Sequence, residues 1–171
     1  MDPLLTISFN SFGSVWFWIM LGFSWSMTCH WTLGVPYDVL VRADQKGGDF
    51  ATYAADLARL NIERTVYVFG RGGAFITAMI FFVLAVIGTF GFFYDYELAQ
   101  AIFVMLAPLA LVTFLNTRLA FQLHRDAPDG PEICKALVGR RFWNQVIGLL
   151  SVVIAAALAF VSFVRHVVIW Y

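Results

Sequence analysis

Four long apolar segments alternate with polar segments along the chain. A helix needs roughly 20 mostly apolar residues to cross the hydrocarbon core of a bilayer, and each segment has about that length. The predicted spans are residues 12–34, 72–93, 98–117 and 142–164. The pattern predicts an all-α fold class in which residues 1–171 form a single transmembrane domain, an integral membrane four-helix bundle.

The polar segment between the first two predicted spans has a helical pattern of its own. Tyr53, Leu57 and Leu60 recur at spacings of four and three, which places them on one face of a helix. Asp49 follows two glycines and can cap the start of that helix. We expect an amphipathic cytoplasmic helix over residues 49–66. It either caps the bundle or docks a partner, and it either lies at the interface or continues into the second span.

The polar segment between the third and fourth predicted spans indicates a second short helical extension. It contains the turn sequence DAPDGP, and Pro131 suits the first position of a helix. We expect this helix to continue through Arg140 and Arg141 into the fourth span. Both arginines would then lie at the level of the lipid headgroups.

The basic residues predict how the bundle is oriented. Ten of the eleven Lys and Arg residues lie in the two long polar segments, and only Arg165 lies elsewhere. Because Lys and Arg are enriched in cytoplasmic loops, both segments are predicted to be cytoplasmic and both termini periplasmic. The short connection that carries Asp95 and Glu97 has no basic residue, which agrees with a periplasmic position. The chain is therefore predicted to be a multi-pass protein of the bacterial cytoplasmic (inner) membrane.

Composition supports contact with lipid and excludes several classes of partner. The chain is 61% hydrophobic and 13% charged, whereas soluble domains are about 45–50% apolar and about 25% charged. The formal net charge is zero, so no basic surface for nucleic acid is expected. The two cysteines, Cys29 and Cys134, form neither a disulfide framework nor a metal-binding pattern, and no metal site is predicted.

The stretch SWSMTCHW, residues 24–31, contains the most distinctive polar side chains of the first span. Four residues of this region recur at spacings of four and would share one face of a helix: Gly22, Ser26, His30 and Gly34. Small residues allow a second helix to approach closely, and Ser and His can hydrogen-bond across the contact. We therefore expect this face to pack against another helix of the bundle or of a partner.

A cofactor at His30 is the competing interpretation. Heme ligation by two histidines requires a second one at the same depth, and His124 and His166 are predicted at other levels. No cofactor is therefore expected, while a heme or a chlorophyll-type pigment held by His30 alone remains an alternative. Trp25 lies near the predicted midplane, where its indole N–H needs a partner. That partner is a residue of the bundle, another subunit, a quinone or a pigment.

Two further features of the spans predict helix packing. Ser151, Ala155 and Ala159 form a stripe of small residues on the fourth span. The stripe fits packing inside the bundle or against a neighbouring subunit. Pro108 in the third span lacks a backbone donor and so leaves the carbonyl of Val104 without its helical partner.

A polar cluster is predicted at the inner membrane face. Asn116 and Arg118 end the third span, Arg71 begins the second, and Asp38 follows the first. These residues could meet near the lipid headgroups. The interpretation that we favour is that they anchor the helices to lipid and make a few hydrogen bonds.

The spans carry no residues for ion transport or catalysis. No Asp, Glu, Lys or Arg lies in the middle third of any predicted span, which disfavours a proton-coupled transporter or pump. No nucleophile has a plausible base nearby, so no catalytic residue is assigned and the chain is not expected to be an enzyme.

The run SFGSVWFWIMLGFSWSMTCHWTLGVPYDVLVRA, followed by DLARLNIERTVYV, resembles a family of small four-span membrane proteins from alphaproteobacteria. The resemblance extends over most of the chain. Members are commonly labelled "component of SufBCD complex". The resemblance implies a link to iron–sulfur cluster assembly, in which this chain would be a membrane-side partner.

These observations lead to three functional hypotheses. The first is a non-enzymatic accessory or assembly subunit that packs against a larger membrane complex of respiratory or photosynthetic type. The second is a small channel or transporter formed by a homo-oligomer. The third is a heme- or pigment-binding membrane protein that uses His30. Lipid is a partner in all three.

Overall fold

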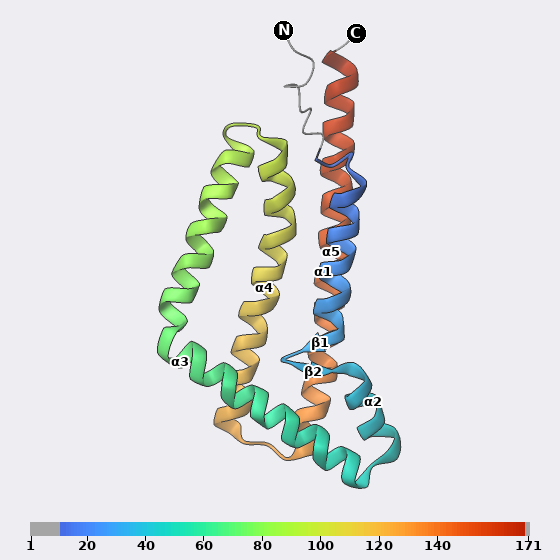
Figure 1. Ribbon diagram of the computed structural model, residues 1–171, viewed down its shortest axis with the longest axis vertical. Helices are drawn as coiled ribbons and strands as arrows, with labels where there is room; N and C mark the ends of the chain where they lie inside the picture. Colours follow the sequence, from blue (N-terminus) through green and yellow to red (C-terminus); the bar gives the residue numbers. More distant parts are fainter. Residues whose placement is uncertain (1–10, 170–171) are drawn as a thin grey trace.

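The computed structural model describes residues 11–169, and these residues form five helices and one short hairpin. The helices are α1 Val15–His30, α2 Tyr37–Lys46, α3 Gly48–Phe92, α4 Glu97–Asp126 and α5 Gly130–Ile169, and the hairpin strands are β1 Trp31–Thr32 and β2 Val35–Pro36. The predicted all-helical class is confirmed. Four helical segments run alongside one another, while α2 and the first half of α3 lie at one end of the molecule (Figure 1).

Three helices, α3, α4 and α5, are long and apolar enough to cross a membrane. They cover residues 72–92 of the predicted span 72–93 and all of the predicted spans 98–117 and 142–164. The predicted helix 49–66 and the second span belong to one continuous helix, α3, of 45 residues. This helix turns a sharp corner (Figure 1), and the run FGRGG at residues 69–73 offers the glycines at which helices commonly bend.

Only part of the first predicted span, 12–34, is helical. Helix α1 ends at His30 after 16 residues, which gives about 24 Å at a rise of about 1.5 Å per residue. The chain then forms the β1–β2 hairpin, in which Trp31 pairs with Pro36 and Thr32 with Val35. Both turn residues, Leu33 and Gly34, have positive φ, as a two-residue hairpin requires. Gly34 therefore does not share a helical face with His30.

The first half of α3 buries a different face from the one predicted. Tyr53 and Leu60 are exposed, and the buried residues are Ala54, Ala55, Ala58 and Ile62. Small side chains are needed here because the start of α5 approaches closely. A Cβ atom added at Gly130 would lie 2.8 Å from the Cβ of Ala55. Helix packing in this region thus selects alanine instead of the larger apolar residues.

The buried side chains form two clusters. One lies at the end of the molecule where α2 and the first half of α3 meet α4 and α5, and includes Leu40, Ile62 and Leu137. The other joins α1, α4 and α5, and includes Trp25 and Val112. Many large apolar side chains face outward, as those of a membrane-spanning domain would. The end of α5 lies beside the α3–α4 turn, opposite α2 (Figure 1).

Candidate functional site

Two consecutive arginines of α5 connect it to three other helices. The Arg140 Nε donates a hydrogen bond to the Asn116 Oδ1 of α4 at 2.9 Å. The Arg141 Nε donates to the Cys29 carbonyl of α1 at 2.9 Å, and its guanidinium carbon lies 3.3 Å from the centroid of the Tyr37 ring of α2. The last carbonyls of a helix lack helical partners, so Arg141 caps the end of α1. Sequence reasoning placed both arginines at the headgroup level but missed these contacts.

The four residues of the predicted inner polar cluster make separate contacts. The Asp38 Oδ2 pairs with the Arg42 Nη2 at 3.7 Å. The Arg71 Nη1 donates to the Tyr67 hydroxyl at 2.6 Å, one turn earlier on the same helix. Residue Asn116 accepts from Arg140, and Arg118 lines an apolar groove between α3 and α4. The contact that joins different helices therefore passes through Asn116.

A cavity of about 670 Å³ adjoins Asn116. It is formed by the end of α1, the β1–β2 hairpin, residues 61–69 of α3 and residues 109–117 of α4. Among the described residues that line it, Arg64 is the only charged one. Its other polar side chains are Thr28, Asn61, Thr65, Thr113, Asn116 and Thr117. The cavity thus combines one cation with neutral hydrogen-bonding groups.

An apolar groove of about 740 Å³ lies between the second half of α3 and α4. Phenylalanine, leucine, isoleucine and alanine dominate its lining, and Arg118 is the one charged residue among the described residues that line it. Three residues, Phe69, Thr113 and Thr117, line both this groove and the cavity. The two volumes therefore lie next to each other along α4.

The predicted packing face of α1 is open. Gly22, Ser26 and His30 are exposed, and no atom lies within 4 Å of a Cβ added at Gly22. The His30 ring contacts the neighbouring Trp31 edge-on at 5.9 Å between centroids. The opposite face of α1 is the buried one and presents Leu21 to the bundle.

The indole of Trp25 packs against α5 instead of facing a partner. A Cβ added at Gly148 would lie 2.7 Å from the Trp25 Cε3, so the ring rests directly on that glycine. Among the described residues, the Trp25 Nε1 has no hydrogen-bond partner. Asn144, one turn before Gly148, is fully buried, and both polar atoms of its side chain also lack partners within the described part of the chain.

The small-residue stripe of α5 points mainly into the bundle. Ser151 and Ala155 are 1% and 0% exposed, while Ala159 is half-buried. The Ser151 Oγ donates to the carbonyl of Val104 at 3.4 Å. Because this is the carbonyl that Pro108 leaves without a helical partner, α5 supplies the donor that α4 lacks.

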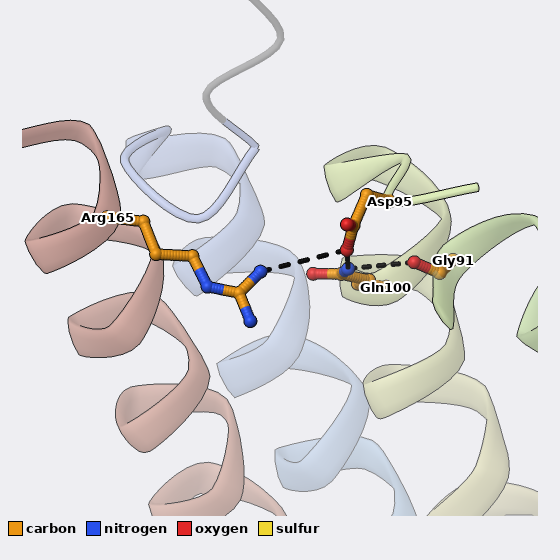
Figure 2. Close-up of polar contacts among 4 residues, drawn as sticks. All are labelled: Gly91, Asp95, Gln100 and Arg165. Carbon is orange, nitrogen blue, oxygen red and sulfur yellow. Dashed lines mark hydrogen bonds and ion pairs between the residues drawn. The ribbon is translucent and has the colours of Figure 1, made fainter. Parts of the chain in front are cut away.

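Polar contacts at the other end of the molecule join α5 to the α3–α4 turn (Figure 2). The Arg165 Nη1 lies 3.7 Å from the Asp95 Oδ1. The Gln100 Nε2 donates to the Gly91 carbonyl at 2.7 Å and to the same Asp95 oxygen at 3.4 Å. Arg165 is the one basic residue outside the two long polar segments, and here it faces an acidic partner.

Two other predicted positions complete the picture. His124 is exposed near the end of α4, and the side chain of His166 lies outside the described residues. Cys134 lies on α5 beside a hollow of about 800 Å³ that α2 and the start of α3 also line. Burial raises the pKa of the Cys134 thiol above its ordinary value.

No group of three or more His, Cys, Asp or Glu side chains that could hold a metal ion occurs within residues 11–169. Comparison of the chain with protein-family models, with curated proteins and with solved structures gives no match.

Proposed function

We propose that the protein crosses the bacterial cytoplasmic membrane four times, with α1 as the additional span. Helix α1 carries no Asp, Glu, Lys or Arg and lies along α5 (Figure 1). Its length of about 24 Å falls short of a hydrocarbon core of about 30 Å, and local thinning of the bilayer compensates for such a difference. The distribution of basic residues supports cytoplasmic polar segments and periplasmic termini.

In this membrane the protein acts as a non-enzymatic accessory or assembly subunit that packs against a larger complex. The observation that carries the proposal is the open face of α1. Trp25 holds α1 against α5, while Gly22, Ser26 and His30 remain exposed. Contact with lipid tails does not require small residues on this face. A neighbouring helix does require them, because it can approach closely only where side chains are small.

The resemblance to the family labelled "component of SufBCD complex" makes iron–sulfur cluster assembly machinery one candidate for the complex, with this chain as its membrane-side partner. Respiratory and photosynthetic assemblies are the other candidates. The open face of α1 serves equally in each case.

The test is gentle purification of tagged protein from its native membrane and identification of the subunits that come with it. The Gly22→Leu change adds bulk where nothing lies within 4 Å, so the chain itself tolerates it. Ala156→Leu adds similar bulk at an exposed position of α5 and serves as the control. We expect Gly22→Leu to release the partner subunits and Ala156→Leu to retain them.

Three results would contradict the proposal. In one, the wild-type protein comes away from the membrane without foreign subunits. In another, both variants retain the same subunits equally. In the third, native mass measurement in mild detergent finds a closed homo-oligomer, which favours the small channel or transporter.

A second candidate function uses the imidazole of His30, which is exposed at the end of α1. A heme or chlorophyll-type pigment bound there would give the purified complex a Soret or chlorin absorption band that His30→Ala removes. A wild-type complex without either band excludes this function.

A further inference from the structure

The cavity beside Asn116 is amphipathic. Met27, Leu109 and Val112 form an apolar wall, and Asn61 and Arg64 contribute polar groups from α3. Residues 61–69 of α3 line the cavity. In its middle part α3 changes from running across the end of the molecule to running along it (Figure 1). In the proposed topology this corner marks the level of the inner-leaflet headgroups.

The positive charge at this cavity has no carboxylate partner. Among the described residues Arg64 makes no ion pair or hydrogen bond, and none of the residues that line the cavity is acidic. Behind the lining, Arg140 donates to the Asn116 Oδ1. The Arg140 Nη2 is buried and finds no acceptor among the described side chains and backbone. A buried guanidinium donor without an acceptor, such as the Arg140 Nη2, is costly. The exposed Arg64 guanidinium forms its strongest hydrogen bonds with an anionic oxygen.

The neighbouring groove supplies room for a hydrocarbon chain. It extends along α3 from Phe69 to Leu84 and along α4 from Ala107 to Phe121. Fourteen residues of helix separate the last two, which corresponds to about 21 Å and suits an extended acyl chain. A free phosphate ion would use the Arg64 guanidinium of the cavity but leave this apolar groove empty.

We propose that the cavity binds the phosphate headgroup of an anionic glycerophospholipid from the inner leaflet, with one acyl chain in the groove between α3 and α4. Arg64 contacts the phosphate, and the amide of Asn116, held by Arg140, donates to it. Arg118 supplies a cation to the neighbouring groove. This site is independent of the open face of α1, and its occupancy is measured without any partner protein.

The test measures which lipid the protein retains. Wild-type protein is placed in nanodiscs of equimolar phosphatidylglycerol and phosphatidylcholine, released, and analysed by native mass spectrometry for bound lipid. We expect a clear preference for phosphatidylglycerol. The Arg64→Gln variant should lower the ratio of the two retained lipids about fivefold, the contribution of one basic residue near anionic lipid. Arg64 is exposed, so its substitution leaves the core of the fold intact.

A matched control separates a defined site from general surface charge. Arg59 is an exposed arginine of the same helix, does not line the cavity and pairs with the Asp56 Oδ1 at 3.6 Å. Arg59→Gln makes the same change in net charge and should leave the lipid ratio unaltered. Arg64→Lys keeps the cation and should retain most of the preference.

The proposal is overturned if wild type shows no preference for phosphatidylglycerol, or if Arg59→Gln lowers the ratio as much as Arg64→Gln does. It is also overturned if excess inorganic phosphate displaces phosphatidylglycerol, because the site would then bind the free anion. Retention of the lipid in excess phosphate, together with loss in Arg64→Gln alone, supports it.

Discussion

The contact between Trp25 and Gly148 predicts a specific loss of stability when Gly148 becomes alanine. The new Cβ would lie 2.7, 3.0 and 3.3 Å from the Cε3, Cδ2 and Cζ3 of Trp25. Carbon atoms in favourable contact lie about 3.5–4.0 Å apart, so the ring or the helix must move. Trp25 is 6% exposed and a rigid indole, and it cannot turn away into solvent.

The magnitude follows from two opposing effects. Overpacking a well-filled core costs about 1–3 kcal/mol, whereas replacing glycine by alanine within a helix gains roughly 0.5–1 kcal/mol. Gly139 offers the matched control, because it also lies in α5 and nothing stands within 4 Å of an added Cβ. The helix gain is common to both variants. Gly148→Ala should therefore be less stable than Gly139→Ala by about 1–3 kcal/mol.

The assay is reversible unfolding in mixed micelles, in which sodium dodecyl sulfate is titrated into a mild detergent and helicity is followed by far-ultraviolet circular dichroism. Tryptophan fluorescence of the folded protein reports the surroundings of the indoles in parallel. If Gly148→Ala is as stable as Gly139→Ala or more so, Trp25 does not rest on Gly148, and the described packing of α1 on α5 is wrong.

Three further predictions concern the other contacts. Ser151→Ala should lower the free energy of unfolding by about 0.6 kcal/mol, the average for a hydrogen bond between membrane helices. Pro108→Ala restores the backbone donor, so in that background a double-mutant cycle should show a smaller effect of Ser151→Ala. Equal losses in both backgrounds would refute the proposed dependence of the Ser151 hydrogen bond on Pro108. Asp95→Asn removes an exposed ion pair with Arg165 and should lower the free energy of unfolding by less than about 1 kcal/mol. Raising the salt concentration should abolish this difference from wild type. A loss of stability that persists in high salt would contradict an electrostatic origin. In a variant whose other cysteine is alanine, Cys134 should react with maleimide more slowly than a free thiol at neutral pH, because its raised pKa lowers the thiolate fraction. Its reaction rate should rise over a higher pH range than that of a model thiol. If the two plots of rate against pH superimpose, the assigned burial of Cys134 is refuted.

Hydrophobic patterning predicted the apolar helices because each is long and lacks charged residues over its middle. The same patterning missed the end of α1, because residues 31–37 carry no charge that would end the uncharged run of the helix. Hydropathy does not distinguish an apolar hairpin from another helical turn, and the local signals were Gly34 and Pro36. The glycines of residues 69–73 gave a clearer signal for the bend of α3. Periodicity alone did not decide whether the predicted helix 49–66 continues into the second span.

Side-chain partners were harder to predict than helices. The face of α3 that packs on α5 consists of alanines, whereas large residues such as Leu60 attract attention in a sequence. Arg141 hydrogen-bonds to the Cys29 carbonyl near the end of α1. This carbonyl is free to accept only because α1 ends there, and the sequence did not predict where α1 ends. By contrast, the sequence predicted that Pro108 leaves the Val104 carbonyl without its helical donor. The Ser151 Oγ donates a hydrogen bond to this carbonyl. The cavity at Arg64 depends on four separate elements and had no local signature.

The most direct test of the account is a map of which side of the membrane four positions occupy. In a variant without native cysteines, single cysteines are introduced as Gly13→Cys, Gln45→Cys, Tyr94→Cys and Asp129→Cys, all at exposed positions. A membrane-impermeant maleimide is then added to intact spheroplasts and to permeabilised cells. The account predicts labelling of positions 13 and 94 in spheroplasts, and of positions 45 and 129 only after permeabilisation. Labelling of positions 13 and 45 from the same side would contradict it, because α1 would then not cross the membrane.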